Sequence, residues 1–180
     1  DNPGTRLNLD WEKIDVNPGG KLRLTGAFTS FSGDDGESGA GISLQHVQTM
    51  IAGATPKDLP VFTNTAWLQY QKGSTALDMG FGVGDDDSDA KSWRLADSLA
   101  WLKGPLTGQT LLTIGQAKRD GEKEKFWSIG GRVAYALTNN FKIQAELGHA
   151  QNKPDGGEKQ NVSKFTIAPT LTVGRDFYAR

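Results

Sequence analysis

The sequence contains no cysteine, which excludes disulfide frameworks, thiolate catalysis and cysteine-ligated zinc. It has no run approaching the roughly 18 apolar residues of a transmembrane helix, and its mean hydropathy is -0.49. It also lacks a charge imbalance: the net charge is -1, so no basic face can neutralise the phosphates of a nucleic acid. A membrane is not excluded, because the strands of a transmembrane barrel alternate lipid-facing and lumen-facing residues.

Signals for an enzyme are missing as well. His46 and His149 lie far apart in the chain, with no metal-ligand spacing around them. No Gly-x-Ser-x-Gly elbow occurs, and the glycine-rich stretch 80–84 precedes no helix that could bind a phosphate. The acidic run 85–89 could attract calcium, but it lacks the glycine and glutamate of an EF-hand loop, which favours a solvated loop. We therefore predict no catalysis, no cofactor and no metal site.

The dominant pattern is an alternation of apolar and polar residues with a period of two, which indicates half-buried β-strands. It is clearest over 125–137, 141–151 and 161–173, each with one apolar face. Within the last segment, Pro169 cannot donate to a sheet ladder, so we expect a bulge or an unpaired position there. The same pattern predicts nine strands in all, over residues 5–16, 21–31, 40–52, 61–71, 92–102, 109–118, 125–137, 141–151 and 161–173.

The predicted connections alternate between short turns and longer polar loops. This asymmetry is typical of outer-membrane barrels, which have short periplasmic turns and longer extracellular loops. The short connections use residues that favour turns and fall at 17–20, 104–108 and 138–140. The longer, charged connections fall at 33–39, 72–91, 119–124 and 152–160, and 54–60 is intermediate.

Strand length supports the same fold. About 11 residues at roughly 3.3 Å each, tilted by about 40°, span roughly 28 Å, close to the apolar band of about 25 Å in such barrels. Strands of globular proteins are shorter, with a mode of about 5–6 residues. The alternative is a soluble antiparallel sandwich or barrel. We predict an all-β chain forming one antiparallel, up-and-down transmembrane β-barrel segment over residues 1–180.

If the apolar faces contact lipid, the opposite faces line a lumen. Trp67 shares the polar face of its strand with Thr65 and Gln69 and could stack on a sugar; the alternative is a lipid-facing tryptophan after a register slip. A second group on this face could bond sugar hydroxyls, or could form a satisfied network within the lumen. Its members are Arg132, Lys142, Gln144, Glu146 and Lys164.

Three motifs carry a resemblance to a known family. They are DVNPGGKLRL at 15–24, FWSIGGRVAY at 126–135 with ELGH at 146–149, and the tail TVGRDFYAR at 172–180. In this order and spacing they resemble the maltoporin family of LamB-type sugar porins, and the resemblance covers most of the chain. It implies an outer-membrane homotrimer of 18-stranded barrels, in which maltodextrins slide along aromatic side chains. Tyr178 corresponds to one aromatic of that slide, where a family member has tryptophan.

The number of strands limits what these residues can form. Barrels of about eight strands are filled by their own side chains, whereas 16–18 strands leave an aqueous channel. Nine strands and the beginning of a tenth are therefore expected to be an incomplete, carboxy-terminal piece of a larger porin domain. The predicted function is passive diffusion of maltodextrin-like oligosaccharides across the outer membrane. The alternatives are a small outer-membrane barrel with a structural or adhesive role, and a soluble carbohydrate-binding β-domain.

Overall fold

A computed structural model describes residues 4–31, 38–51, 61–73 and 89–173, and these residues form strands joined by turns. Within these segments, no helix has the length and apolar character needed to cross a membrane. The nine strands are β1 (Gly4–Asn17), β2 (Gly20–Phe31), β3 (Ser38–Ile51), β4 (Val61–Gly73), β5 (Lys91–Lys103), β6 (Leu106–Arg119), β7 (Glu122–Ala136), β8 (Phe141–Pro154) and β9 (Gln160–Leu171).

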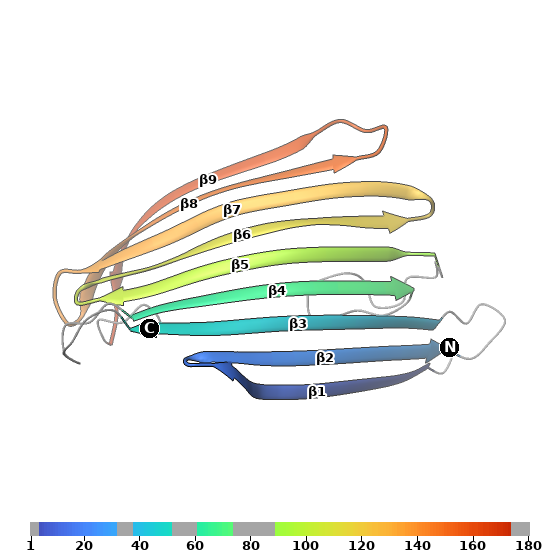
Figure 1. Ribbon diagram of the computed structural model, residues 1–180. Helices are drawn as coiled ribbons and strands as arrows, with labels where there is room; N and C mark the ends of the chain where they lie inside the picture. The colour runs from blue at the N-terminus through green and yellow to red at the C-terminus, as the bar shows by residue number, and fades with distance from the viewer. Residues whose placement is uncertain (1–3, 32–37, 52–60, 74–88, 174–180) are drawn as a thin grey trace.

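The strands form one sheet in which each pairs antiparallel with its neighbours in chain order, from β1 to β9 (Figure 1). This is the predicted up-and-down arrangement, and the all-β fold class is confirmed. The sheet is twisted and curved, and in the described part of the chain β1 and β9 are its two edges (Figure 1). The nine strands therefore form an open, curved wall.

The register places most of the large apolar residues of the strands on one face. Trp11, Leu24, Leu44, Leu68, Leu95 and Ile114 follow one another as direct partners across β1–β6. We call this the outer face and the opposite one the lumen face. Large apolar residues of the outer face are exposed: 65% of Leu147 and 68% of Phe165.

The buried apolar residues are small. Among the described residues, every buried apolar side chain is an alanine. A soluble sandwich would instead bury its large apolar residues between two layers. An apolar face that is left uncovered and a lumen face of small and polar residues are what a membrane barrel requires.

Some predicted details of the connections are wrong. The stretch 119–124 is a tight hairpin, since only Asp120 and Gly121 separate β6 from β7. Both have positive φ, 49° and 83°, as in a type I′ turn. The turn predicted at 104–108 is shorter, because β6 already begins at Leu106. Of the two alternatives predicted at Pro169, the bulge is absent, because Pro169 lies opposite Ile143 without a register shift. It belongs to an edge strand of the described sheet, where proline is tolerated.

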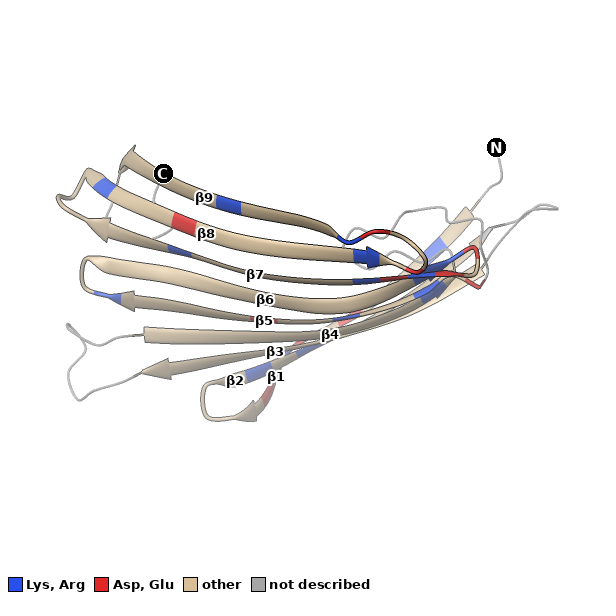
Figure 2. Cartoon of the chain, turned by 90° about the horizontal axis from the view of Figure 1, so that it is seen from above, with Lys and Arg blue, Asp and Glu red and all other residues tan. Residues whose placement is uncertain are grey.

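The two ends of the sheet differ in charge. Lysine, arginine, aspartate and glutamate gather at the end that carries the β6–β7 and β8–β9 turns, while the opposite end has few charges (Figure 2). The charged hairpins continue their strand pairing beyond the apolar stretch, for example from Lys118 opposite Lys123 to Arg119 opposite Glu122. The more heavily charged end fits the longer, charged connections predicted for the extracellular side.

Candidate functional site on the lumen face

Trp67 lies on the lumen face of β4, as the alternation predicts. Its direct partners are Gln45 on β3 and Ala96 on β5, and no register shift interrupts either pairing. Ala96 is small and 3% exposed, so the neighbouring strand leaves room above it for the half-buried indole. The register slip that would turn Trp67 toward lipid is absent from the described β3–β5 pairings.

Three of the predicted polar residues form an ion cluster. Glu146 lies opposite Arg132, and its Oε2 is 3.3 Å from the Arg132 Nε. The Lys164 Nζ donates to the Glu146 Oε1 at 2.9 Å. Because all three side chains remain partly exposed, the cluster presents one carboxylate between two cations to the lumen.

Gln144 and Lys142 do not belong to that cluster. The Gln144 Nε2 donates to the Thr170 Oγ1 at 2.9 Å, across the β8–β9 pairing. Lys142 is only 2% exposed and is the second residue of β8, at the end of that strand away from the β8–β9 turn. The structure therefore brings Arg132, Glu146 and Lys164 together but leaves Gln144 in a separate contact.

The prediction missed a hollow of about 550 Å³ near the charged end of the sheet. It is built on a cross-strand row of direct partners on the lumen face. The row runs through Gln69, Arg94, Gly115, Phe126, Asn152 and Gln160 on β4–β9.

Gly115 allows this row to pack. A Cβ there would lie 2.3 Å from the Phe126 Cζ, so the phenyl ring covers the position that a side chain would occupy. The guanidinium carbon of Arg94 lies 5.1 Å from the centroid of the same ring. Arg94 is thus held over an aromatic face in a cation–π geometry.

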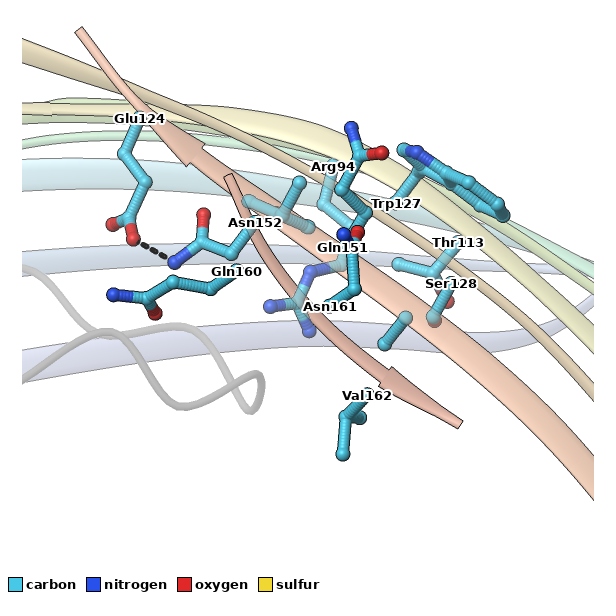
Figure 3. Close-up of a pocket in the computed structure, with 12 residues that line it drawn as sticks. Arg94, Thr113, Glu124, Trp127, Ser128, Gln151, Asn152, Gln160, Asn161 and Val162 are labelled. Carbon is cyan, nitrogen blue, oxygen red and sulfur yellow. Dashed lines mark hydrogen bonds between the residues drawn. The ribbon is translucent and has the colours of Figure 1, made fainter. Parts of the chain in front are cut away.

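Amide groups complete the hollow. The Asn152 Nδ2 donates to the Glu124 carboxylate, and Gln160 lies beside them (Figure 3). The Asn152 Oδ1 is buried and accepts no hydrogen bond among the described residues. Trp127 projects away from Arg94 (Figure 3). Its ring is instead 5.2 Å from that of His149 on the outer face.

The sequence did contain one signal for this hollow. Phe126 is the single large apolar residue on the small, polar face of its strand. An aromatic that breaks the alternation opposite a glycine indicates that the ring covers that glycine. Recognising the partner, however, requires the β6–β7 register, which the wrongly predicted loop at 119–124 obscured.

A second missed cluster lies on β1 and β2. Arg23 is bidentate to Asp10, with Nε–Oδ1 at 3.0 Å and Nη2–Oδ2 at 3.1 Å. Thr25 donates to the same carboxylate, and Glu12 lies 3.2 Å from the Arg23 Nε. Paired charges therefore occur on the lumen face near both edges of the sheet.

Two sequence predictions fall outside the described residues. Tyr178 belongs to 174–180, and all but Asp89 of the acidic run belongs to 74–88. No group of three or more potential metal ligands occurs within the described segments.

The lumen face thus combines aromatic rings with paired charges and amides along one side of a membrane-barrel wall. The family model described as LamB porin matches residues 1–180. The chain belongs to the LamB porin family. LamB porins are outer-membrane proteins that form channels, so the outer face contacts that membrane and the lumen face lines a pore. No curated protein matches this LamB porin.

Proposed function

We propose that this LamB porin lets maltodextrin-like oligosaccharides diffuse passively through its channel, and that the described strands supply part of the sugar path. The observation that carries the proposal is the lumen face itself. It presents Trp67 and the Arg94–Phe126 stack among groups that can donate or accept hydrogen bonds.

Sugar chemistry suits such a surface. The faces of a pyranose ring present C–H groups to an aromatic ring, and its edges carry hydroxyls that need partners once water is removed. In the hollow, Arg94 supplies donors, Glu124 supplies acceptors, and Asn152 and Gln160 supply both. The buried Asn152 Oδ1 is an acceptor that a sugar hydroxyl would satisfy.

Transport requires that each contact be weak enough to release the sugar. Several partly exposed contacts along the wall serve this better than one deep pocket. Trp67, the hollow and the Arg132–Glu146–Lys164 cluster lie at different positions across β4–β9, so a chain of sugars could exchange between them. Tyr178 would add a further aromatic position.

A continuous aqueous channel needs more strands than the nine described. Barrels of 16–18 strands leave such a channel. We propose that these strands form one side of an 18-stranded barrel and that three barrels assemble into a homotrimer. The described residues would then be a portion of a single barrel domain.

The test is blockage of ion current by maltodextrins across a planar bilayer containing the intact protein. Trp67→Ala is expected to raise the sugar dissociation constant about 2- to 12-fold, because a stacking contact is worth about 0.5–1.5 kcal/mol. The matched control is Trp101→Ala, which removes a tryptophan from the outer face. A wild-type current that maltodextrins do not block would refute the sugar channel.

A further inference from the structure

Lysines line the outer face at the charged end of the sheet (Figure 2). We call this group the outer lysine belt, and its members are Lys72 on β4, Lys91 on β5, Lys118 on β6, Lys123 and Lys125 on β7, and Lys153 on β8. The first four form one row in which each lysine is the direct cross-strand partner of the next. Lys125 and Lys153 lie opposite each other in the neighbouring row. All are exposed except Lys118, which is half-buried.

Aromatic side chains lie beside the belt, on its side toward the centre of the sheet. On three strands an aromatic residue and a lysine are two positions apart and therefore share the outer face. The pairs are Tyr70–Lys72, Trp93–Lys91 and Trp127–Lys125. Aromatic residues mark the interfaces of an outer-membrane barrel. Two residues correspond to about 7 Å along a strand, so the lysine ammonium groups extend from this interface into the headgroup region.

The belt crosses the sheet diagonally. On β3, β2 and β1 the row that contains Lys72 continues as Ala40, Phe28 and Leu7. On β8, Lys153 lies one row nearer the centre of the sheet. Strands of membrane barrels are tilted by about 35–45°, so a row perpendicular to the strands leaves the apolar band gradually. The change from apolar residues to lysines therefore follows one level of the membrane.

The belt concentrates positive charge without internal compensation. Like charges directly opposite each other destabilise a sheet. The carboxylates of the same strand ends, Glu122 and Glu124, lie on the lumen face, where Glu122 is opposite Arg119. The acidic residues of the adjoining connections that the structure describes are Asp89, Asp120 and Asp155, and in the described part of the chain no ion pair joins them to the belt. An anion from outside the chain would offset this repulsion.

We propose that the outer lysine belt binds the phosphate groups of an anionic lipid in the adjacent membrane leaflet. Lysine binds phosphate as a point charge, and clusters of lysine at a membrane surface recognise phosphorylated headgroups. The belt faces away from the lumen and lies directly beside the apolar surface that acyl chains cover. A molecule that joins phosphates to acyl chains can therefore contact the lysines and the aromatic residues at once, whereas a soluble anion contacts only the lysines.

Binding of lipid A, which carries both phosphates and acyl chains, tests the proposal on the intact protein in a non-ionic detergent. Native mass spectrometry measures the dissociation constant. Lys91→Gln and Lys103→Gln are a matched pair, because these lysines are the first and last residues of β5, are exposed and share the outer face. Lys91→Gln is expected to raise the constant about fivefold, since a lysine near an anionic headgroup contributes about 1 kcal/mol. Lys103→Gln leaves it unchanged, and Lys91→Arg, which keeps the charge, retains the wild-type affinity.

Four results would overturn the proposal. They are no binding of lipid A to the wild-type protein, equal affinity for lipid A from which the phosphates have been removed, an equal loss in Lys103→Gln, and displacement of lipid A by inorganic phosphate, which would indicate a site for a soluble anion. Heat-modifiable gel mobility shows that each variant is folded. Block of the current by maltodextrins is measured separately, so a failure of the sugar channel is distinguished from a failure of lipid binding.

Discussion

Glu146 sets the charge of the lumen face between β7 and β9. It holds Lys164 at 2.9 Å and Arg132 at 3.3 Å, so that one negative charge lies between two positive ones. Ion pairs this exposed contribute only about 0–1 kcal/mol to stability. Their larger effect is on the electrostatic potential that ions meet inside the channel.

Glu146→Gln is therefore expected to leave the fold intact and to shift ion selectivity toward anions, because two cations lose their counter-charge. The reversal potential in a salt gradient across a planar bilayer measures this shift. Glu158→Gln, in the connection between β8 and β9, is the control and should change the potential less. An unchanged reversal potential in Glu146→Gln would place this cluster outside the ion path.

Arg94 is the residue whose removal should most directly affect sugar binding in the hollow. Arg94→Leu keeps an apolar contact with Phe126 but removes the guanidinium donors. We expect the maltodextrin dissociation constant to rise about tenfold, which corresponds to about 1.5 kcal/mol for a hydrogen bond to a charged group. The measurement is sugar block of the current. Lys153→Leu, on the outer face of β8, should leave the constant unchanged, and an equal effect of both variants would contradict a local contact.

At the scale of the strands, the sequence predicted nearly all of the fold. Each of the nine strands lies where the alternation of apolar and polar residues placed it. The period of two is visible because only one face of each strand meets an apolar solvent, here the lipid. The faces of Trp67 and Glu146 could be predicted for the same reason.

The hairpin between β6 and β7 shows where that reasoning fails. Around it, Lys118, Glu122, Glu124 and Lys125 are charged on both faces of the strands, so the alternation disappears although the ladder continues. The strands extend beyond the apolar band into water, where neither face is selected for hydrophobicity. The Asp120–Gly121 pair was the remaining signal, since it favours a type I′ turn.

The Asp120–Gly121 turn also gives a prediction about stability. Gly121 has a φ of 83°, which costs a residue with a side chain about 1–2 kcal/mol. Gly121→Val is expected to destabilise the hairpin by about that amount, since a β-branched residue is strained there. Unfolding by urea in detergent micelles measures the loss. Lys123→Val adds the same side chain in an extended segment of the same hairpin and should have little effect.

At the scale of the whole molecule, a site depends on where its residues lie along the sheet as well as on which face they occupy. The lumen face can be assigned from each strand alone, but the hollow around Arg94 requires the register of six strands. This combination is not visible in a single sequence, because residues such as Arg94 and Asn152 are far apart in the chain. The pairing of strands that are distant in the sequence must therefore be known before these residues can be assigned to one site.

The two edges of the sheet give the last prediction. In the described part of the chain, β1 and β9 each pair on one side only, and their free backbone groups can pair with another chain. The 180-residue chain refolded alone in detergent is therefore expected to associate through these edges. It is also expected to show no maltodextrin-blockable current, because nine strands enclose too little space for an aqueous channel. Light scattering coupled to size-exclusion chromatography measures the association, and a monomer with β1 paired to β9 would contradict it. Because lipid covers only the outer face, membrane insertion alone cannot satisfy these edges; in the proposed 18-stranded barrel, further strands would pair with them.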